Sequence, residues 1–166
     1  MPCIIGIISD THGLMRLEAI AALHGSSVII HAGDIGNESV LRTLEGIAPV
    51  YAVRGNNDTG EWAATIPIAT RVTIAEISIH VLHDIGELNA TLGTEPVHVV
   101  VTGHSHRPLI EERHGILFVN PGSAGPRRFT LPVSVAKLEI RDKRPTATLI
   151  ELSIESHHRR RTGLIL

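Results

Sequence analysis

The chain has 166 residues, a length typical of one domain, and its 43% hydrophobic and 19% charged residues are typical of a folded globular protein. Its formal net charge of −2 excludes a general electrostatic attraction to nucleic acid, and its single cysteine, Cys3, excludes an internal disulfide framework. No apolar run approaches the ~20 residues of a membrane span, so we expect one cytoplasmic domain over residues 1–166 with no membrane contact.

The first third of the chain alternates short apolar runs with amphipathic stretches. The apolar runs are rich in β-branched residues, as expected of strands buried on both faces, and span residues 3–9, 27–32 and 49–55. Residues 16–23 have helical spacing and end at a glycine, and a second helix is predicted from a cap at Asn37 or Ser39 to about Gly46. This order predicts parallel strands joined by right-handed crossovers.

The second half of the chain indicates further strands and one short helix. Residues 71–84 are typical of two strands or one long bent strand, and a helix is predicted at residues 87–92. A buried strand is expected at 97–103, then a hairpin over 108–120 that turns at His114 and Gly115, then a closing antiparallel pair. This mixture predicts an α/β fold in which two packed mixed β-sheets form a β-sandwich flanked by helices.

Five of the predicted strands end in residue types that bind metals. The candidates are Asp10, His12, Asp34, Asn56, His83, His104 and His106. Because reactive crevices form outside the carboxyl ends of strands in α/β sheets, we expect these side chains to meet there. Imidazole suits zinc, iron, manganese or nickel and carboxylate suits harder ions, so the mixed set tolerates several divalent metals. Asp34 has two oxygens with which to bridge two ions, and Asn56 offers a neutral oxygen.

The stretch GHSH places His104 and His106 two residues apart. In an extended segment this spacing points both rings to one side, where each could reach a different ion. Gly33, Gly55 and Gly103 each directly precede a candidate ligand. Each is expected either to keep the backbone close to the site or to allow a positive φ.

Simpler structural roles explain five of the candidates when each is taken alone. Asp10 could cap a helix beside a surface histidine, Asp34 and Asn56 suit tight turns, and His83 could be a hydrogen-bonded core or edge residue. Because independent turns need not fall in this order, the five motifs together favour the metal site.

The remaining histidines are interpreted as structural or solvated. His31 and His80 lie inside strand runs, and His31 could support a ligand from behind. Surface or turn positions are expected for His24, His98 and His114. The basic stretch at 157–161 is interpreted as a solvated terminus rather than a phosphate contact.

The motif order Asp-x-His, Gly-Asp, Gly-Asn, His and Gly-His-x-His resembles the calcineurin-like metallophosphoesterase superfamily, specifically its branch of small single-domain bacterial and archaeal phosphodiesterases. The stretch NPGS at residues 120–123, followed by Arg127 and Arg128, is also similar to that branch. The resemblance runs from residue 4 to about residue 128. It implies the same helix-flanked β-sandwich as the predicted elements.

The resemblance implies two divalent metal ions, with Asp34 bridging them. The ligands of the first ion would be Asp10, His12 and His106, and those of the second Asn56, His83 and His104. Two ions roughly 3.5 to 4 Å apart lower the pKa of a shared water, and the resulting bridging hydroxide attacks the phosphorus of a small phosphodiester or phosphomonoester. Manganese is the expected metal, with nickel, iron or zinc as alternatives.

Two positions depart from the family pattern. Many members have a histidine where this chain has Asn57, so the expected catalytic part of Asn57 is a hydrogen bond to the phosphoryl group rather than proton donation. Asp84 stands where relatives commonly have glycine, and its carboxylate could repel an anionic substrate or steady a metal-bound imidazole. Arg127 and Arg128 are candidate phosphate contacts, with surface solvation as the alternative.

Two other functions compete with the small-molecule hydrolase. The retromer subunit that shares this fold resembles a metallophosphoesterase used as an interaction platform, so a catalytically weak or inactive metal-binding scaffold is the main alternative. A nuclease is less favoured, though not excluded, because the chain lacks a broad basic surface and a set of aromatic residues for stacking bases. A homo-oligomer is left open, since the apolar end TGLIL could dock on a neighbour or pack on its own sheet.

Overall fold

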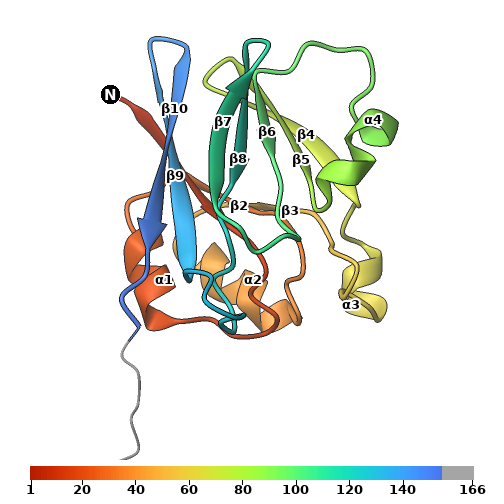
Figure 1. The fold of residues 1–166 in the computed structure, drawn as a ribbon, viewed down its shortest axis with the longest axis vertical. Helices are drawn as coiled ribbons and strands as arrows, with labels where there is room; N and C mark the ends of the chain where they lie inside the picture. Colours follow the sequence, from red (N-terminus) through yellow and green to blue (C-terminus); the bar gives the residue numbers. More distant parts are fainter. Residues whose placement is uncertain (155–166) are drawn as a thin grey trace, which may run out of the picture.

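Two five-stranded mixed sheets face each other in the computed structural model, which describes residues 1–154 (Figure 1). The first sheet has the order β10 (Arg144–Glu151), β9 (Ser134–Arg141), β1 (Cys3–Ile8), β2 (Val28–His31) and β3 (Val50–Ala52). The second has the order β4 (Ala69–Ile74), β5 (Ile77–Leu82), β6 (Val99–Val101), β8 (Ile116–Asn120) and β7 (Leu109–Arg113). The predicted sandwich of two mixed sheets is confirmed.

Each sheet contains three strands that pair in parallel, and those of the first sheet are the ones that the alternation of strands and helices predicts. In the first sheet β1 pairs with β2 and β2 with β3, and in the second β5 pairs with β6 and β6 with β8, all in parallel. Helix α1 (Leu17–Leu23) joins β1 to β2, and α2 (Glu38–Glu45) joins β2 to β3. The cap of α2 is Asn37, whose side chain accepts a hydrogen bond from the backbone N–H of Val40.

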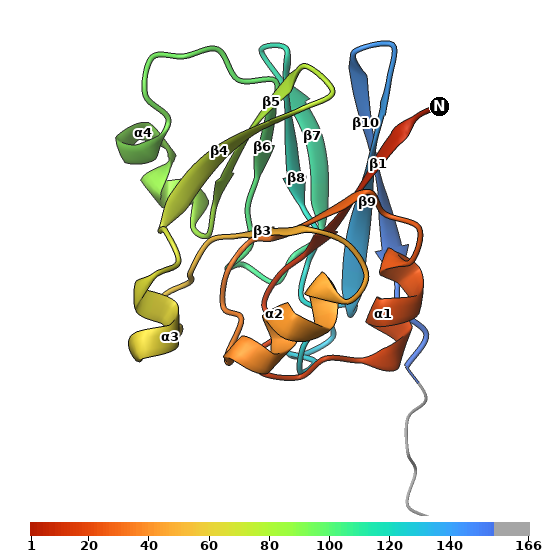
Figure 2. The same cartoon turned by 180° about the vertical axis from the view of Figure 1, so that it is seen from behind.

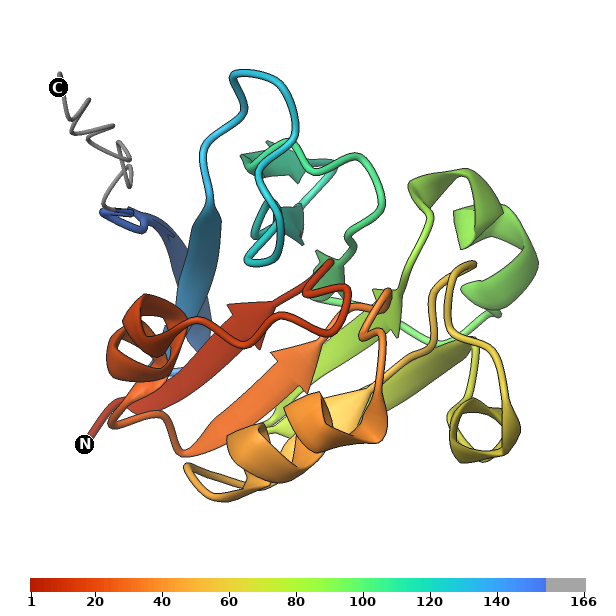
Figure 3. The same cartoon turned by 90° about the horizontal axis from the view of Figure 1, so that it is seen from below.

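Aliphatic side chains fill two layers on either side of the first sheet. Alternate residues such as Ile5 and Ile7 in β1 face Ile79 and Val101 of the second sheet. On the opposite face, other residues of β1 and β2 pack with α1 and α2, which lie on the side of these strands away from the second sheet (Figure 3). In the part of the chain that the structure describes, no helix has the length and apolar character needed to cross a membrane.

Three tight hairpins connect the antiparallel strands (Figure 2). Residues 71–84 form two strands rather than one bent strand, because Ala75 and Glu76 turn the chain with positive φ angles. The predicted turn at His114 and Gly115 and the closing pair of β9 and β10 are confirmed.

The structure differs from the predicted elements at two short helices. The predicted helix at 87–92 begins earlier, as a single 3₁₀ turn (Ile85–Glu87) followed by α4 (Leu88–Thr91), because the side chain of Asp84 caps the N–H of Gly86. Helix α3 (Glu61–Ala64) was not predicted, since four residues are too few to show helical periodicity. The basic stretch at 157–161 and the apolar end TGLIL lie outside the described residues.

Candidate metal centre

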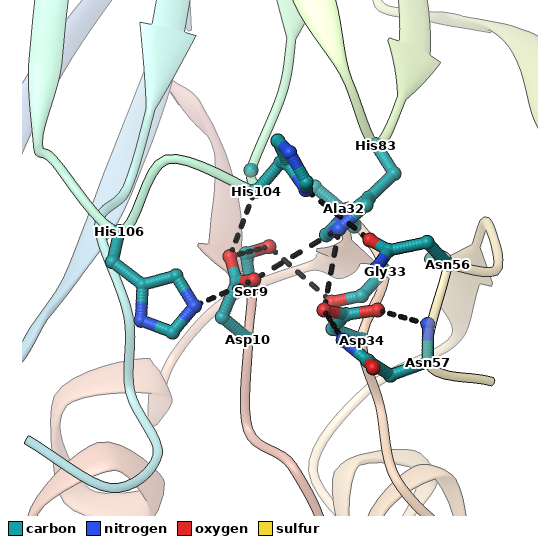
Figure 4. Close-up of polar contacts among 12 residues, drawn as sticks. Ser9, Asp10, Ala32, Gly33, Asp34, Asn56, Asn57, His83, His104 and His106 are labelled. Atoms are coloured by element: carbon teal, nitrogen blue, oxygen red, sulfur yellow. Dashed lines mark hydrogen bonds and ion pairs between the residues drawn. The ribbon is translucent and has the colours of Figure 1, made fainter. Parts of the chain in front are cut away.

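The seven candidate ligands meet at the carboxyl ends of strands from both sheets, and Figure 4 labels all of them except His12. The ligands after β1, β2 and β3 come from the first sheet, and those after β5 and β6 come from the second. Asp10, Asp34, His83 and His106 are buried, His12 is half-buried, and Asn56 and His104 are exposed. The cluster therefore has a buried floor and a rim that is open to a substrate.

Asp10, His12 and His106 form one group. The Nε2 atom of His106 lies 3.2 Å from Oδ1 of Asp10 and 3.4 Å from Nε2 of His12. Candidate ligand atoms of the three residues lie within 4.8 Å of one another, a separation that suits a shared cation.

The second group lies around Asp34. Candidate ligand atoms of Asp10, Asp34 and His83 again lie within 4.8 Å of one another. Oδ2 of Asp34 is 3.4 Å from Nε2 of His83 and 3.8 Å from Nε2 of His12, so this carboxylate faces a histidine of each group. Nδ1 of His104 lies 3.2 Å from Oδ1 of Asn56, and the rings of His104 and His83 pack edge to face with centroids 5.1 Å apart.

Two features of this cluster suit divalent cations. Among the described residues, the ion pairs of Asp10 and Asp34 are made only with histidines, so two buried carboxylates lack a lysine or arginine counter-ion. Nε2 of His83 and Oδ1 of Asp10 are buried and make no hydrogen bond within the described chain. Because the carbonyl oxygen of Ala32 can only accept, Nδ1 of His83 carries the proton of that 2.7 Å bond and Nε2 keeps a lone pair for a metal.

The pKa values of the cluster reflect its burial and its hydrogen bonds. Burial would raise the pKa of Asp34, but the close contact with His83 and the hydrogen bonds from Asn57 outweigh it and hold the pKa well below its ordinary value. Burial likewise opposes protonation of His83, yet the nearby carboxylate of Asp34 and the hydrogen bond to Ala32 raise its pKa. Burial lowers the pKa of His12, offset in part by the charges of Asp34 and Asp10.

Five of the seven candidate ligands have left-handed backbone conformations. Their φ angles lie between 46° and 66°, and they are Asp10, His12, Asp34, His104 and His106. This conformation costs residues other than glycine about 1 kcal/mol or more each and is concentrated at functional sites. The binding geometry is therefore maintained by the surrounding packing rather than by local backbone preference.

The conformation of GHSH corrects one expectation. With φ of 66° at His104 and 58° at His106, the segment is a tight turn rather than an extended strand. The two rings diverge, His106 toward Asp10 and His104 toward Asn56 (Figure 4). Each histidine still reaches a different group, as expected, but through the turn.

The glycines before the ligands have the two expected functions. Gly33 has a φ of 97°, which disfavours other residues. Gly55 has an ordinary φ but lies so close to Asp34 that a Cβ would be 2.4 Å from the backbone nitrogen of Asp34. A side chain at position 55 would push the two ligand loops apart.

His31 joins the first two ligand loops from behind. Its Nδ1 accepts a bond of 3.2 Å from the N–H of Gly33, so Nε2 carries the proton and donates to Oγ1 of Thr11 at 2.9 Å. Thr11 donates in turn to the carbonyl of Ile35. His31 therefore has the structural role that was predicted for it, because it supports the segments that carry Asp10 and Asp34. His80 is also buried, and its Nε2 lies 3.0 Å from Oγ1 of Thr91.

We expect His31 to make the stability of the metal-free protein depend on pH. Burial lowers its pKa to about 4, so the unfolded chain binds a proton near pH 6.5 that the folded chain does not accept until about pH 4. Stability is therefore lost as the pH falls from 6.5 to 4, by about 2 kcal/mol between pH 7 and pH 5 from this residue. Urea unfolding of the wild type and of His31→Gln at both pH values measures the difference in slope. Equal pH dependence in the two proteins would contradict this assignment.

Three residues for which no function was predicted also hold the ligand loops. Asp58 is buried, and its carboxylate accepts hydrogen bonds from the N–H groups of Ile35, Gly36 and Gly55. Asn120 donates to the carbonyl of Gly103, and Ser123 donates to that of Asp10. Asn120 and Ser123 belong to the NPGS stretch, and that motif could have identified them from the sequence. No such motif contains Asp58, which resembles an ordinary turn residue in the sequence.

The other candidate residues lie at the rim. Asn57 donates its backbone N–H to Oδ1 of Asp34 at 2.9 Å and its Nδ2 to Oδ2 at 2.7 Å. Arg127 and Arg128 are exposed, and Arg128 lies near enough for its charge to lower the pKa of His12. Oδ2 of Asp84 is 3.9 Å from Nε2 of His104. Asp10 does not cap α1, whose N-cap is Arg16.

Comparison with known proteins agrees with the motif order. The calcineurin-like phosphoesterase superfamily domain matches residues 4–143. A probable metallophosphoesterase of Methanothermobacter thermautotrophicus is 32% identical over 162 residues, covering 89% of this chain and 91% of the relative. A solved archaeal phosphodiesterase is 26% identical with a TM-score of 0.71, covering 89% of this chain and 99% of its own. Vacuolar protein sorting 29 of Cryptosporidium parvum shares the fold at 21% identity and a TM-score of 0.70, covering 92% and 99%.

Proposed function

Because the chain belongs to the calcineurin-like phosphoesterase superfamily, we propose that it hydrolyses small phosphodiesters at the candidate metal centre with two divalent ions. The observation that carries this proposal is the convergence of seven ligand-type side chains from five strand ends: five form the two groups within 4.8 Å, and Asn56 and His104 adjoin them at His83. All seven positions keep a metal-binding residue type, which favours an enzyme over an interaction scaffold.

The two groups of side chains suggest how two ions would be held. The first would take Asp10, His12 and His106, and the second Asn56, His83 and His104. The position of Asp34 between His12 and His83 supports its assignment as the bridging carboxylate. Manganese is the metal we favour, since the set mixes imidazole nitrogen with hard oxygen ligands.

The chemistry divides between the ions and the chain. Divalent ions, when bound, supply Lewis acidity and lower the pKa of a water molecule. Asn57 and Arg128 stand at the rim, where an amide donor and a guanidinium can orient the phosphoryl oxygens. The amide of Asn57 does not titrate, so it orients the phosphoryl group without donating a proton to the departing alcohol.

Two features favour small diesters among phosphate esters. The carboxylate of Asp84, 42% exposed at the rim, opposes the second negative charge of a monoester more than the single charge of a diester. The net charge of −2 and the four aromatic residues favour a small molecule over nucleic acid.

Metal removal tests the proposal. Chelation is expected to reduce hydrolysis of bis(p-nitrophenyl) phosphate by about 100-fold or more, because the bound ions supply the Lewis acidity that activates water. Resupply of manganese is expected to restore it, with nickel, iron and zinc compared separately. Hydrolysis that survives full metal removal would contradict the mechanism, and no hydrolysis with any metal would favour the scaffold.

A further inference from the structure

A cavity of about 410 Å³ lies on the outer face of the second sheet, beside the candidate metal centre. Its apolar surface comes from Phe118 of β8, Pro108 and Leu109 at the start of β7, and Ile85 in the 3₁₀ turn. Ile85 and Leu109 are 45% and 43% exposed, so the cavity opens to solvent between them. Its size is within the range of pockets that bind small organic molecules.

The cavity borders the metal centre at His104. The residue contributes to the cavity wall together with Gly103, while its Nδ1 lies 3.2 Å from Asn56 in the centre. His104 and Asp84 also border a second hollow, which contains Asn56 and His83. A molecule with its phosphoryl group at the centre would therefore have the cavity next to it, on the other side of the exposed ring of His104.

Most polar groups in the cavity wall are already bonded within the protein. Asn120 donates to the carbonyl of Gly103 and to Oγ of Ser105, and its Oδ1 accepts from Gly122. The guanidinium of Arg113 lies over the ring of Phe118 and is paired with Glu111. With these donors and acceptors engaged, the cavity selects for apolar surface rather than for the hydrogen-bonding edge of a base or sugar.

We propose that this cavity binds an apolar or aromatic ester group of the substrate. This assignment rests on the proposed function for the phosphoryl end of the substrate. It adds a preference for the alcohol that is esterified to the phosphate: aryl and branched apolar esters are favoured over methyl or polar esters. Phe118 provides the aromatic floor, and Leu109 and Ile85 enclose the group at the opening.

Leu109→Asp tests the assignment. Leu109 lies on the edge strand β7 and is 43% exposed, so a charged side chain there is compatible with folding. The charge is expected to raise the KM for bis(p-nitrophenyl) phosphate roughly tenfold in the manganese-loaded protein. Leu17→Asp, at a 79% exposed position on α1, makes the same change away from the cavity and is expected to leave the KM unchanged.

A binding measurement separates this assignment from the proposed function. In the metal-free protein, phenol is expected to shift the amide NMR signals of Leu109 and Phe118, and methanol is not. Leu109→Asp is expected to weaken phenol binding, and Leu17→Asp is not. Turnover with an unchanged KM in Leu109→Asp, or phenol shifts away from the cavity, would overturn the assignment. Phenol shifts at the cavity in a protein that hydrolyses no diester with any metal would contradict the proposed function and still assign the cavity to an aryl group.

Discussion

Replacing Asp34 with asparagine is expected to lower kcat/KM for bis(p-nitrophenyl) phosphate roughly 10³-fold, equivalent to about 4 kcal/mol of transition-state stabilisation. The carboxylate is buried, and its Oδ2 lies 3.4 Å from His83 and 3.8 Å from His12. Asparagine keeps the size of the side chain but removes the negative charge that offsets the repulsion of two cations. Metal content after dialysis against manganese is expected to fall with the activity.

Asp142→Asn is the matched control for this prediction. Asp142 lies in the turn between β9 and β10 with a φ of 51°, a conformation that asparagine adopts readily. The same loss of one charge there is expected to leave metal content and kcat/KM unchanged. Full metal content and activity in Asp34→Asn would exclude the bridging assignment.

The residues of the site could be predicted from the sequence because parallel strands bring their carboxyl ends together. The stretches after β1, β2 and β3 had to lie on one edge once the strands paired in parallel. The same reasoning places His83 after β5 beside the GHSH turn after β6. Strand order and residue type were therefore sufficient to predict most of the fold and the candidate ligands.

The conformation of the ligand loops could not be predicted in this way. Apolar periodicity identifies strands, but it contains no information about single left-handed residues such as His104 and His106. The bonds of Asp58 connect loops more than 20 residues apart, so they exist only in the folded chain. The cavity beside His104 likewise combines residues from the 3₁₀ turn, β7 and β8, which no local pattern relates.

Asp58→Ala is expected to destabilise the metal-free protein by about 3–5 kcal/mol, and to lower its Tm by roughly 10 °C. Oδ2 of Asp58 accepts from Ile35 at 3.1 Å and from Gly55 at 2.8 Å, and Oδ1 accepts from Gly36 at 2.9 Å. Alanine leaves three backbone donors without their charged acceptor: those of Ile35 and Gly36, which follow Asp34, and that of Gly55, which precedes Asn56. Urea unfolding and thermal melts measure the loss.

Asp58→Asn distinguishes the hydrogen bonds from the space that the side chain fills. Asparagine has nearly the same shape, but it keeps one acceptor oxygen and turns an NH₂ group toward backbone N–H groups that must also donate. If the hydrogen bonds determine stability, Asp58→Asn is expected to lower the free energy of unfolding nearly as much as Asp58→Ala. If packing determines stability, the loss in Asp58→Asn is expected to be small. Because the same carboxylate joins the loops of Asp34 and Asn56, manganese affinity is expected to fall in both variants. Unchanged stability and affinity in both would show that these loops keep their positions without Asp58.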